Sequence, residues 1–518
     1  MRFSKVFSAQ NHMLKAHVIS VEMDMSRGLH SFSIVGLPDK AIEEARDRVS
    51  AAIKNSGFKS PKQTNAKITV SLAPADIRKE GPAFDLPIAL AYLLSAEEIE
   101  FDPEGKLFIG ELALDGSLRP IRGALSYAKL ALSKGIQEIY VPKENAPEAA
   151  LIDGVRVFGI KTLTEVISHL HTKESDGFEK IVLSPEQKLD PKTLIMENTA
   201  TTDLDDIAGQ ETAKRGLIIA AAGIHNIALF GPPGTGKTML ARALQSILPP
   251  LSFEEMLEVT EIHSVAGRLE GSLITTSPVR SPHHTASYAS LVGGGGTPKP
   301  GEITLAHRGI LFLDEFPEFD KRVIESLRQP LEDRIISISR SKGTAQFPAH
   351  FILVAALNPC PCGNRGVSGK TCICAPADIA RYARKLSGPI MDRIDMWIEV
   401  SKIDHEKLMR HKSDSHETDS ARHTVVMART KQRERFKKVA INAHSNSSIH
   451  SRDLAKGTFL SKSAEETLNK AAQTYDISGR GYHSTVKLAR TIADIENSET
   501  IEAPHILEAL QYRQKHFI

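Results

Sequence analysis

The chain has 518 residues, too many for one hydrophobic core, so we expect about three domains of roughly 150 residues each. Hydrophobic residues make up 41% of the sequence and charged residues 25%, which excludes a predominantly disordered chain. The 65 Lys and Arg nearly balance the 63 Asp and Glu, so any surface that binds nucleic acid must be a local basic patch. No apolar run approaches the ~18 residues of a membrane span, and the first residues lack the apolar core of a signal peptide. We therefore expect a cytoplasmic protein with no membrane partner.

The first 170 residues alternate two kinds of pattern. Short β-like runs lie at residues 68–72, 107–109 and 138–141, and helix-like stretches lie at 39–56, 84–94 and 123–133. This alternation predicts a compact α/β domain at residues 1–170. Polar residues dominate the following segment, 171–204, which we interpret as a linker, although its apolar residues 181–183 also suit a short docked strand.

A second α/β domain is predicted at residues 205–400. Its strands, at 227–230, 309–313 and 351–357, are short and apolar and are bounded by turn signals, as expected of buried parallel strands. From residue 401 to residue 518 the pattern is helical. Leu468, Ala471 and Tyr475 recur at helical spacing there, as do Leu488, Ile492 and Ile495.

A glycine-rich motif joins the strand at 227–230 to a helix at 239–248, the setting in which such a loop binds nucleotide phosphates. Its glycines let backbone N–H groups turn towards phosphate oxygens, and the amino terminus of the helix adds a favourable dipole. We expect the Lys237 ammonium to bridge the β- and γ-phosphates of ATP and the Thr238 hydroxyl to bind Mg²⁺. The whole motif is Gly231, Pro232, Pro233, Gly234, Thr235, Gly236, Lys237 and Thr238.

Polar residues follow the other predicted strands. Open parallel sheets bind ligands at the carboxyl ends of their strands, so Asp314 suits the Mg²⁺ shell and Glu315 the activation of the attacking water. Asn358 ends the strand at 351–357 and is placed to hold this water. Arg393 precedes a further apolar segment, and in ring ATPases such an arginine reaches the active site of a neighbouring subunit. Taken alone, an arginine of this kind is more often part of a surface ion pair.

All four cysteines of the chain lie between residues 360 and 374. In a reducing compartment this clustering argues against disulfides. Four thiolates across a glycine-rich loop can bind Zn²⁺ tetrahedrally and stiffen a loop that is too small to have a core. The C-x-C pairs are tighter than the common C-x-x-C pairs, so free thiols in a loop are the alternative. The residues are Cys360, Cys362, Cys372 and Cys374.

Two insertions carry cations suited to contact with a nucleic-acid backbone. The first, at 263–301, also contains a glycine run and the adjacent His283 and His284, which we do not expect to share a metal because neighbours on an extended segment point in opposite directions. The second, at 335–344, has alternating residues on one arm and a turn at 341–343, a pattern that predicts a β-hairpin. Each cation by itself could equally be a solvated charge, but the hairpin as a unit favours DNA contact. The candidate DNA-binding residues are Arg280, Lys299, Arg340 and Lys342.

With these motifs in view, the chain resembles the AAA+ ATPases of the magnesium-chelatase-like group, specifically the ComM (YifB-type) proteins. The resemblance covers nearly the whole chain and rests on the segments at 206–210, 281–285, 300–307 and 478–480. It implies an AAA+ P-loop domain with a helix-2 insert at 205–400 and a helical lid at 401–518. The domain at 1–170 resembles the proteolytic domain of Lon, a ribosomal S5 domain 2-like fold, and the related domain of the recombination protein RadA.

The resemblance also implies roles for single residues. Lys237 and Thr238 match the Walker A motif, Asp314 and Glu315 the Walker B motif, Asn358 sensor 1 and Arg393 the trans-acting arginine finger. Sensor 2 matches Arg480 best, with Arg490 as a rival that the sequence leaves open. Ile207 and Ala208, which precede the P-loop, belong to the expected nucleotide contacts.

The function that the resemblance implies is that of a homohexameric, ATP-driven DNA motor, which promotes branch migration of recombination intermediates, notably in natural transformation. The alternative is a remodelling chaperone of the magnesium-chelatase type that acts on a protein partner. A Lon-like protease is disfavoured because Ala83 and Leu125 replace the nucleophilic serine and the activating lysine. Basic residues of the same domain could instead contact DNA phosphates, although each of them by itself could equally be a solvated surface charge; they are Arg78, Lys79, Arg119 and Arg122.

Overall fold

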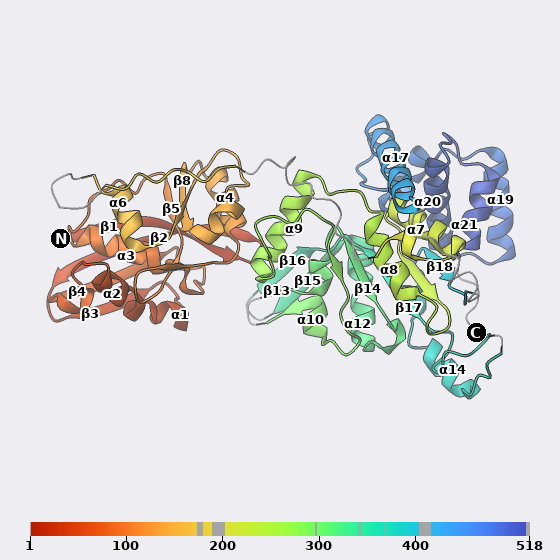
Figure 1. Ribbon diagram of the computed structural model, residues 1–518, viewed down its shortest axis with the longest axis horizontal. Helices are drawn as coiled ribbons and strands as arrows, with labels where there is room; N and C mark the ends of the chain where they lie inside the picture. Colours follow the sequence, from red (N-terminus) through yellow and green to blue (C-terminus); the bar gives the residue numbers. More distant parts are fainter. Residues whose placement is uncertain are drawn as a thin grey trace. The chain divides into compact units, whose positions relative to one another are not determined.

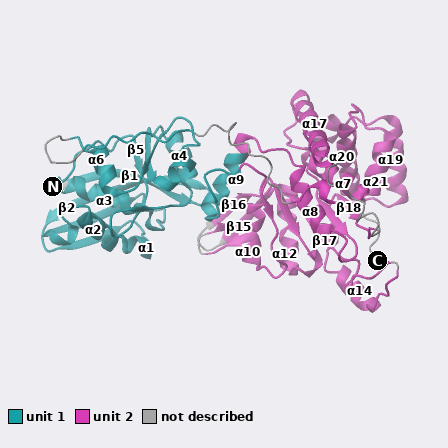
Figure 2. Ribbon diagram, in the orientation of Figure 1, with its two compact units in different colours: residues 1–195, 256–274 teal, residues 196–255, 275–518 magenta. Residues whose placement is uncertain are grey.

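The computed structural model describes residues 2–172, 180–188, 202–295, 298–340, 343–367, 369–403 and 416–513. The chain divides into two compact units (Figure 2): residues 1–195 and 256–274 form unit 1, and residues 196–255 and 275–518 form unit 2. Residues 256–274, which lie inside the predicted second domain, therefore pack with the first one. Among the described residues, none of the helices is both long enough and apolar enough to cross a bilayer.

Unit 1 contains a four-stranded sheet with the order β1-β2-β4-β3. Strands β1 (Arg2–His12) and β2 (Lys15–Arg27) form a long antiparallel hairpin, and β4 (Ala66–Ala73) pairs with β2 and with β3 (Ser31–Val35). Every second residue of β2 from Ile19 to Met25 is buried, and these side chains form a core with α2 (Ala45–Asn55) and α3 (Asp85–Ser95). The predicted strand at 68–72 and helix at 84–94 are confirmed, whereas the β1–β2 hairpin was not predicted.

A second, parallel sheet of unit 1 has the order β5-β8-β9. It consists of β5 (Lys106–Phe108), β8 (Glu138–Pro142) and β9 (Arg156–Ile160). The rings of Phe108, Tyr140 and Phe158 stack across the three strands with centroids 4.8 and 4.9 Å apart. The remaining elements of the unit are α1 (Lys40–Glu43), β6 (Glu111–Leu112), β7 (Leu118–Arg119), α4 (Ala124–Ser133), α5 (Ala146–Ala149), α6 (Leu163–Leu170) and most of α9 (Phe253–Ala266).

The predicted linker is partly described. Residues 181–183 do not form a strand, but Leu183 packs against the core of unit 1 and its N–H donates to His169 Nδ1 at 3.1 Å. The N–H of Glu186 donates to the carbonyl of Val157 at the start of β9. Two ion pairs, Lys143 with Glu186 and Lys188 with Asp153, also join this part of the segment to unit 1, so it is docked through polar contacts and the apolar contact of Leu183.

Unit 2 is built on a five-stranded parallel sheet with the order β11-β14-β17-β10-β18. Strands β14, β17 and β18 of this sheet are labelled in Figure 1. The strands are β10 (Ile227–Phe230), β11 (Val279–Arg280), β14 (Ile310–Leu313), β17 (Ile352–Leu357) and β18 (Met396–Glu399). Every residue of β14 and β17 is buried, as the apolar runs predicted for parallel strands. The registers Phe230↔Leu357 and Leu313↔Ala355 bring the carboxyl ends of β10, β14 and β17 to one edge of the sheet.

Two small hairpins accompany this sheet. Strands β12 (Gly293–Gly294) and β13 (Lys299–Pro300) form one of them, and β15 (Ile335–Arg340) and β16 (Gly343–Pro348) form the other. The second confirms the hairpin that the sequence predicted, with Arg340 paired to Gly343. One face of it is buried through Ile336, Ile338, Ala345 and Phe347. Ser341 and Lys342, at the predicted tip, lie outside the described residues.

The helices that follow residue 401 pack on the same unit. They are α17 (Glu417–Lys438), α18 (Leu454–Thr458), α19 (Lys462–Thr474), α20 (Gly479–Ile495) and α21 (Ala503–Gln511). Leu468, Leu488 and Ile492 are buried in a core shared with α7 (Glu211–Gly223) and α8 (Lys237–Ser246), which confirms the helical pattern. The shorter helices of unit 2 are α10 (Tyr288–Val292), α11 (Glu302–Leu305), α12 (Lys321–Ser326), α13 (Arg328–Asp333), α14 (Pro376–Ala383) and α15 (Gly388–Met391).

Candidate nucleotide site and cysteine cluster

The glycine-rich loop at 231–238 connects β10 to α8, as the sequence predicted. Gly234 and Gly236 have φ angles of 77° and 89°, in the left-handed region that only glycine adopts without strain. Gly231 is required for a different reason, because a Cβ atom there would collide with the carbonyl oxygen of Val400. The backbone thus has the conformation needed to direct N–H groups at an anion beyond the amino terminus of α8.

Lys237 is almost completely buried at the first position of α8. Its Nζ donates to the carbonyl oxygens of Gly231 and Pro232, both at 2.8 Å, and to Asn358 Oδ1 at 3.1 Å. Burial lowers the pKa of Lys237, while the nearby Asp314 carboxylate opposes this shift. The ammonium is bonded to neutral oxygens alone, so a phosphate oxyanion at this position would be a stronger partner.

Thr238 and Asp314 lie together where β14 ends. The Thr238 hydroxyl donates to Asp314 Oδ2 at 3.1 Å, and the N–H of Glu315 donates to Asp314 Oδ1 at 2.9 Å. A hydroxyl and a carboxylate in contact are the protein ligands that a phosphate-bound Mg²⁺ uses. These residues therefore fit the metal that the motif implies.

Glu315 contacts a residue to which the sequence analysis assigned no role in hydrolysis. Nδ1 of His284 lies 3.3 Å from Glu315 Oε2. His284 comes four residues after β11, and β11 is the neighbour of β14 in the sheet. This contact could not be predicted from the sequence, because the pairing of β11 with β14, rather than spacing along the chain, brings His284 and Glu315 together.

Arg393 and Arg480 meet at one carboxylate, that of Glu332 on α13. Both guanidinium groups pair with Glu332, and Arg393 also donates to the carbonyl oxygen of Pro389 at 2.6 Å. Burial raises the pKa of Glu332, but the hydrogen bond and charge of Arg393, together with Arg480, hold it below its ordinary value. The buried Nε of Arg393 has no hydrogen-bond partner among the described residues.

Arg490 has a different environment. Its side chain is fully buried on α20, where it donates to the carbonyl oxygens of Ser498 and Glu499 at 2.6 and 2.7 Å and pairs with Asp494 at 3.0 Å. These contacts hold α20 against the loop that precedes α21. Arg480 lies instead near the start of α20, beside the loop of Arg393.

The other expected nucleotide contacts precede α7. Ile207 and Ala208 are both buried, and Ile207 belongs to the core that contains residues of α7 and α8. Gln210, at the start of α7, donates to the carbonyl oxygen of Ser401 at 2.6 Å. This segment is therefore held between the phosphate-loop helix and the chain that leaves β18.

The candidate DNA-binding residues differ in whether their side chains are already paired within the chain. Arg280, on the edge strand β11, makes two hydrogen bonds to Glu302 at 2.6 and 2.9 Å, whereas Lys299 on β13 is exposed. Arg340 ends β15, and Lys342 lies outside the described residues.

In unit 1, the prediction that Lys79 contacts DNA is wrong. Its side chain is fully buried and its Nζ donates to the Pro74 carbonyl oxygen, while its backbone pairs with residues 37–39. Arg78, Arg119 and Arg122 are exposed.

The two positions that Lon uses for its dyad carry no chemistry here. Leu125 is fully buried near the start of α4, and its N–H donates to Glu148 Oε1 at 2.9 Å. The same oxygen accepts a bond from Ser264 Oγ of α9 at 2.5 Å. Burial raises the pKa of Glu148. With Ala83 at the other position, the pair has neither a hydroxyl nor an amine.

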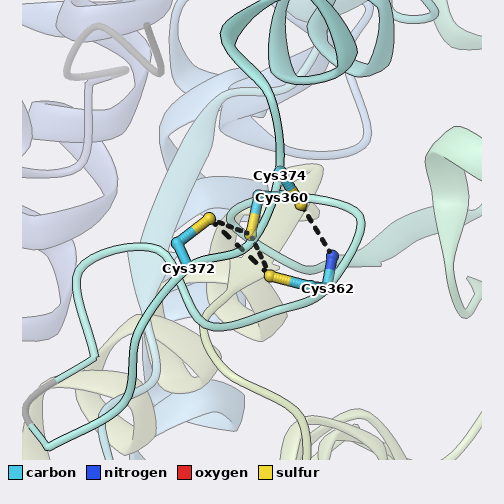
Figure 3. A group of neighbouring side chains, drawn as sticks. All are labelled: Cys360, Cys362, Cys372 and Cys374. Carbon is cyan, nitrogen blue, oxygen red and sulfur yellow. Dashed lines mark hydrogen bonds between the residues drawn. The ribbon is translucent and has the colours of Figure 1, made fainter.

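The four cysteines converge in the loop between β17 and α14 (Figure 3). The Sγ atoms of Cys360, Cys362 and Cys372 lie 3.4, 3.6 and 3.7 Å apart, and Cys374 Sγ accepts from the N–H of Cys362 at 3.4 Å. Tetrahedral Zn²⁺ with Zn–S bonds of about 2.3 Å requires S···S distances of roughly 3.8 Å, so the cluster fits this ion.

The electrostatics and position of the cluster also suit a bound cation. Hydrogen bonds from the backbone N–H groups of Asn364 and Ile373 lower the pKa of Cys362 to about 6. A backbone hydrogen bond also lowers the pKa of Cys372 and of Cys374, but burial and hydrogen bonds with the neighbouring thiols outweigh it and raise both pKa values, as expected of thiols crowded together without a cation. The loop begins two residues after Asn358. It also touches the phosphate loop, because a Cβ atom at Gly363 would lie 2.6 Å from Pro233 Cδ.

Known proteins and family models match nearly the whole chain. Family models described as subunit ChlI of magnesium chelatase match residues 21–145 and 203–408, and a model of the ChlI C-terminal region matches 415–513. The competence protein ComM of Haemophilus influenzae is 40% identical over 99% of this chain and 98% of its own length. The chain belongs to the ComM/YifB family of magnesium-chelatase-like proteins.

Two further relatives are consistent with this membership. The uncharacterized protein YifB of Salmonella typhimurium is 41% identical over 96% of this chain and 95% of its own length. Lon protease 2 of Bacillus subtilis is 29% identical over 30% of this chain and 30% of its own length. Membership of this AAA+ family implies an ATP hydrolase with ATP and Mg²⁺ as cofactors.

Proposed function

We propose that the chain is a subunit of a homohexameric, ATP-dependent DNA motor that promotes branch migration of recombination intermediates. Its partners would be single-stranded and branched DNA, its compartment the cytoplasm and its context natural transformation, which the name of the competence relative supports. The observation that carries the proposal is the joint position of Arg393 and Arg480 on Glu332. Among the described residues, neither arginine bonds to its own phosphate loop. Such arginines suit a site completed by a neighbouring subunit, and a closed ring is the arrangement in which every subunit has such a neighbour.

Within each site the residues divide the work of hydrolysis. ATP with Mg²⁺ supplies the phosphoryl group and the charge neutralisation that its transfer needs. Lys237 exchanges its carbonyl partners for phosphate oxygens, and Thr238 and Asp314 hold the cation. Glu315 orients and polarises the attacking water with Asn358 beside it, and Arg393 and Arg480 of a neighbouring subunit stabilise the charge that develops.

The two hairpins of unit 2, β12–β13 and β15–β16, would bind the DNA backbone. The insert at 263–301, in the role of a helix-2 insert, contributes Lys299, and Arg280 contributes only if it exchanges Glu302 for a phosphate. The β15–β16 hairpin contributes Arg340 and Lys342. The packed inner face of this hairpin supports the proposal, because a grip that transmits force must be anchored in its own domain.

We further propose that the four cysteines hold a structural Zn²⁺. The ion would stiffen the loop that joins Asn358 to the segment carrying Arg393 and that touches Pro233 of the phosphate loop. Metal analysis of the purified protein should find about one zinc per chain, and a chelator should lower the thermal unfolding midpoint. The absence of zinc together with an unchanged midpoint would remove this site.

The decisive experiment is ATP-dependent processing of a four-stranded DNA junction by the purified protein. We expect junction processing and DNA-stimulated ATP turnover in the wild type and neither in the Asp314→Asn/Glu315→Gln variant. Robust turnover without any activity on DNA would favour the remodelling chaperone. Junction processing by the double variant would contradict the motor.

A further inference from the structure

We propose that Glu332 is a positioning residue that holds Arg393 and Arg480 as one unit and ties them to the β15–β16 hairpin. The inference rests on the proposed function, because it assigns the two arginines to a neighbouring subunit's nucleotide. Two groups of contacts carry it: those between the arginines and Glu332, and those between α13 and the hairpin.

The carboxylate serves both arginines at once. Glu332 Oε1 accepts from Arg480, at the beginning of α20, and Oε2 accepts from Arg393, after α15. Two guanidinium groups this close repel each other unless an anion lies between them. The Glu332 carboxylate supplies that anion, so it allows two cations from segments far apart in sequence to be presented together.

Arg393 depends on this anchor more than Arg480 does. Only 13% of the Arg393 side chain is exposed, against 42% for Arg480. Its three nitrogens have unequal partners: one bonds to Glu332, one to the Pro389 carbonyl oxygen, and the buried Nε to no described residue. Without Glu332, a single carbonyl bond would hold the guanidinium, and its direction would no longer be defined.

Glu332 is also fixed to the hairpin. It lies on α13, only three residues before β15 begins at Ile335. One turn earlier on the same helix, the side chain of Gln329 brackets β15: its Oε1 accepts from the N–H of Ser337 at 3.1 Å and its Nε2 donates to Ser337 Oγ at 3.2 Å. Glu332 and the root of the hairpin therefore move together, so DNA bound at the hairpin can change the position of both arginines.

The test compares Glu332→Ala, Glu332→Asp and Arg393→Ala in the full chain by ATP turnover with and without single-stranded DNA. We expect Arg393→Ala to lower kcat by about 10³-fold. Glu332→Ala should lower kcat on the order of 10-fold and abolish DNA stimulation, with KM for ATP changed less than about two-fold, because it misplaces the arginines without removing them. Glu332→Asp, which keeps the charge on a shorter arm, should recover part of the loss.

The control is Asp47→Ala, which removes an exposed ion pair with Lys62 in unit 1 and should leave turnover and thermal midpoint unchanged. An unchanged kcat in Arg393→Ala would overturn the proposed trans site itself. A lowered kcat in Arg393→Ala with an unchanged or raised kcat in Glu332→Ala would overturn the role of Glu332 alone. Gln329→Ala gives a second measurement: basal turnover should persist while stimulation by DNA falls.

Discussion

The phosphate-loop edge of unit 2 and the Lon-like position of unit 1 are both places where related proteins carry out chemistry, yet only one is equipped for it. At the phosphate loop, the side chains that the motif requires are present and in contact: Lys237 with Asn358, and Thr238 with Asp314. At the Lon-like position, Ala83 and Leu125 stand in place of a hydroxyl and an amine. Likeness of fold therefore says little about activity until the individual side chains are examined.

The largest effect is expected from a change in the phosphate loop. Lys237→Ala removes the one cation that lies inside the phosphate loop, so ATP turnover should fall by at least about 10³-fold and junction processing with it. Some DNA binding should remain, because the hairpins are separate from the loop. Turnover is measured by phosphate release and DNA binding by fluorescence anisotropy. Turnover within ten-fold of the wild type would contradict the assignment of the loop.

The next effect tests whether the Lon-like position could still accept a lysine. Leu125 is fully buried among apolar side chains of α4, so Leu125→Lys should lower the free energy of unfolding by about 3 kcal/mol and yield no peptidase. Leu132→Lys, on the half-exposed face of the same helix, is the control and should change it by less than about 0.5 kcal/mol. Urea denaturation measures both, and equal values for the two variants would show that the site tolerates the charge.

A smaller effect is expected at the contact between His284 and Glu315. His284→Ala frees the Glu315 carboxylate, so kcat should fall by up to about ten-fold with little change in KM for ATP. His284→Asn can retain a hydrogen bond and should lose less. Steady-state ATP turnover distinguishes the two variants. If both match the wild type, the contact has no part in catalysis.

The smallest effect on turnover is expected at a buried ion pair of unit 1, Arg48 with Asp85, which should affect stability alone. Burial raises the pKa of Asp85 to about 6 and outweighs the Arg48 hydrogen bond and charge, which lower it. A folded-state pKa above the unfolded value means that the folded state binds the proton more tightly, so this contribution is present below about pH 4 and is lost as the pH rises to about 6. The loss should be about 3 kcal/mol, and Asp85→Asn should remove it. Urea denaturation at several pH values between 4 and 7 tests this, and an identical pH dependence in both proteins would contradict it.

Much of the nucleotide site could be predicted from the sequence, because the residues that form it follow local patterns along the chain. The phosphate loop needs glycines at fixed offsets between a strand and a helix, and Asp314 needs only to follow an apolar strand. The hairpin at 335–348 was also predictable, since its alternating residues and its turn are contiguous. The four cysteines are close in sequence as well, although only the fold brings their Sγ atoms to within 4.8 Å of one another.

The tertiary structure alone decided the contacts between segments that are distant in the chain. Strand order placed His284 on Glu315, and packing of α20 buried Arg490 while leaving Arg480 beside Arg393. Lys79 is buried where its backbone pairs with residues 37–39, and residues 256–274 joined unit 1. The physical reason is common to these cases. Local spacing determines backbone conformation and which side chains are available, whereas burial and the pairing of charges depend on which surfaces meet when the whole chain has folded.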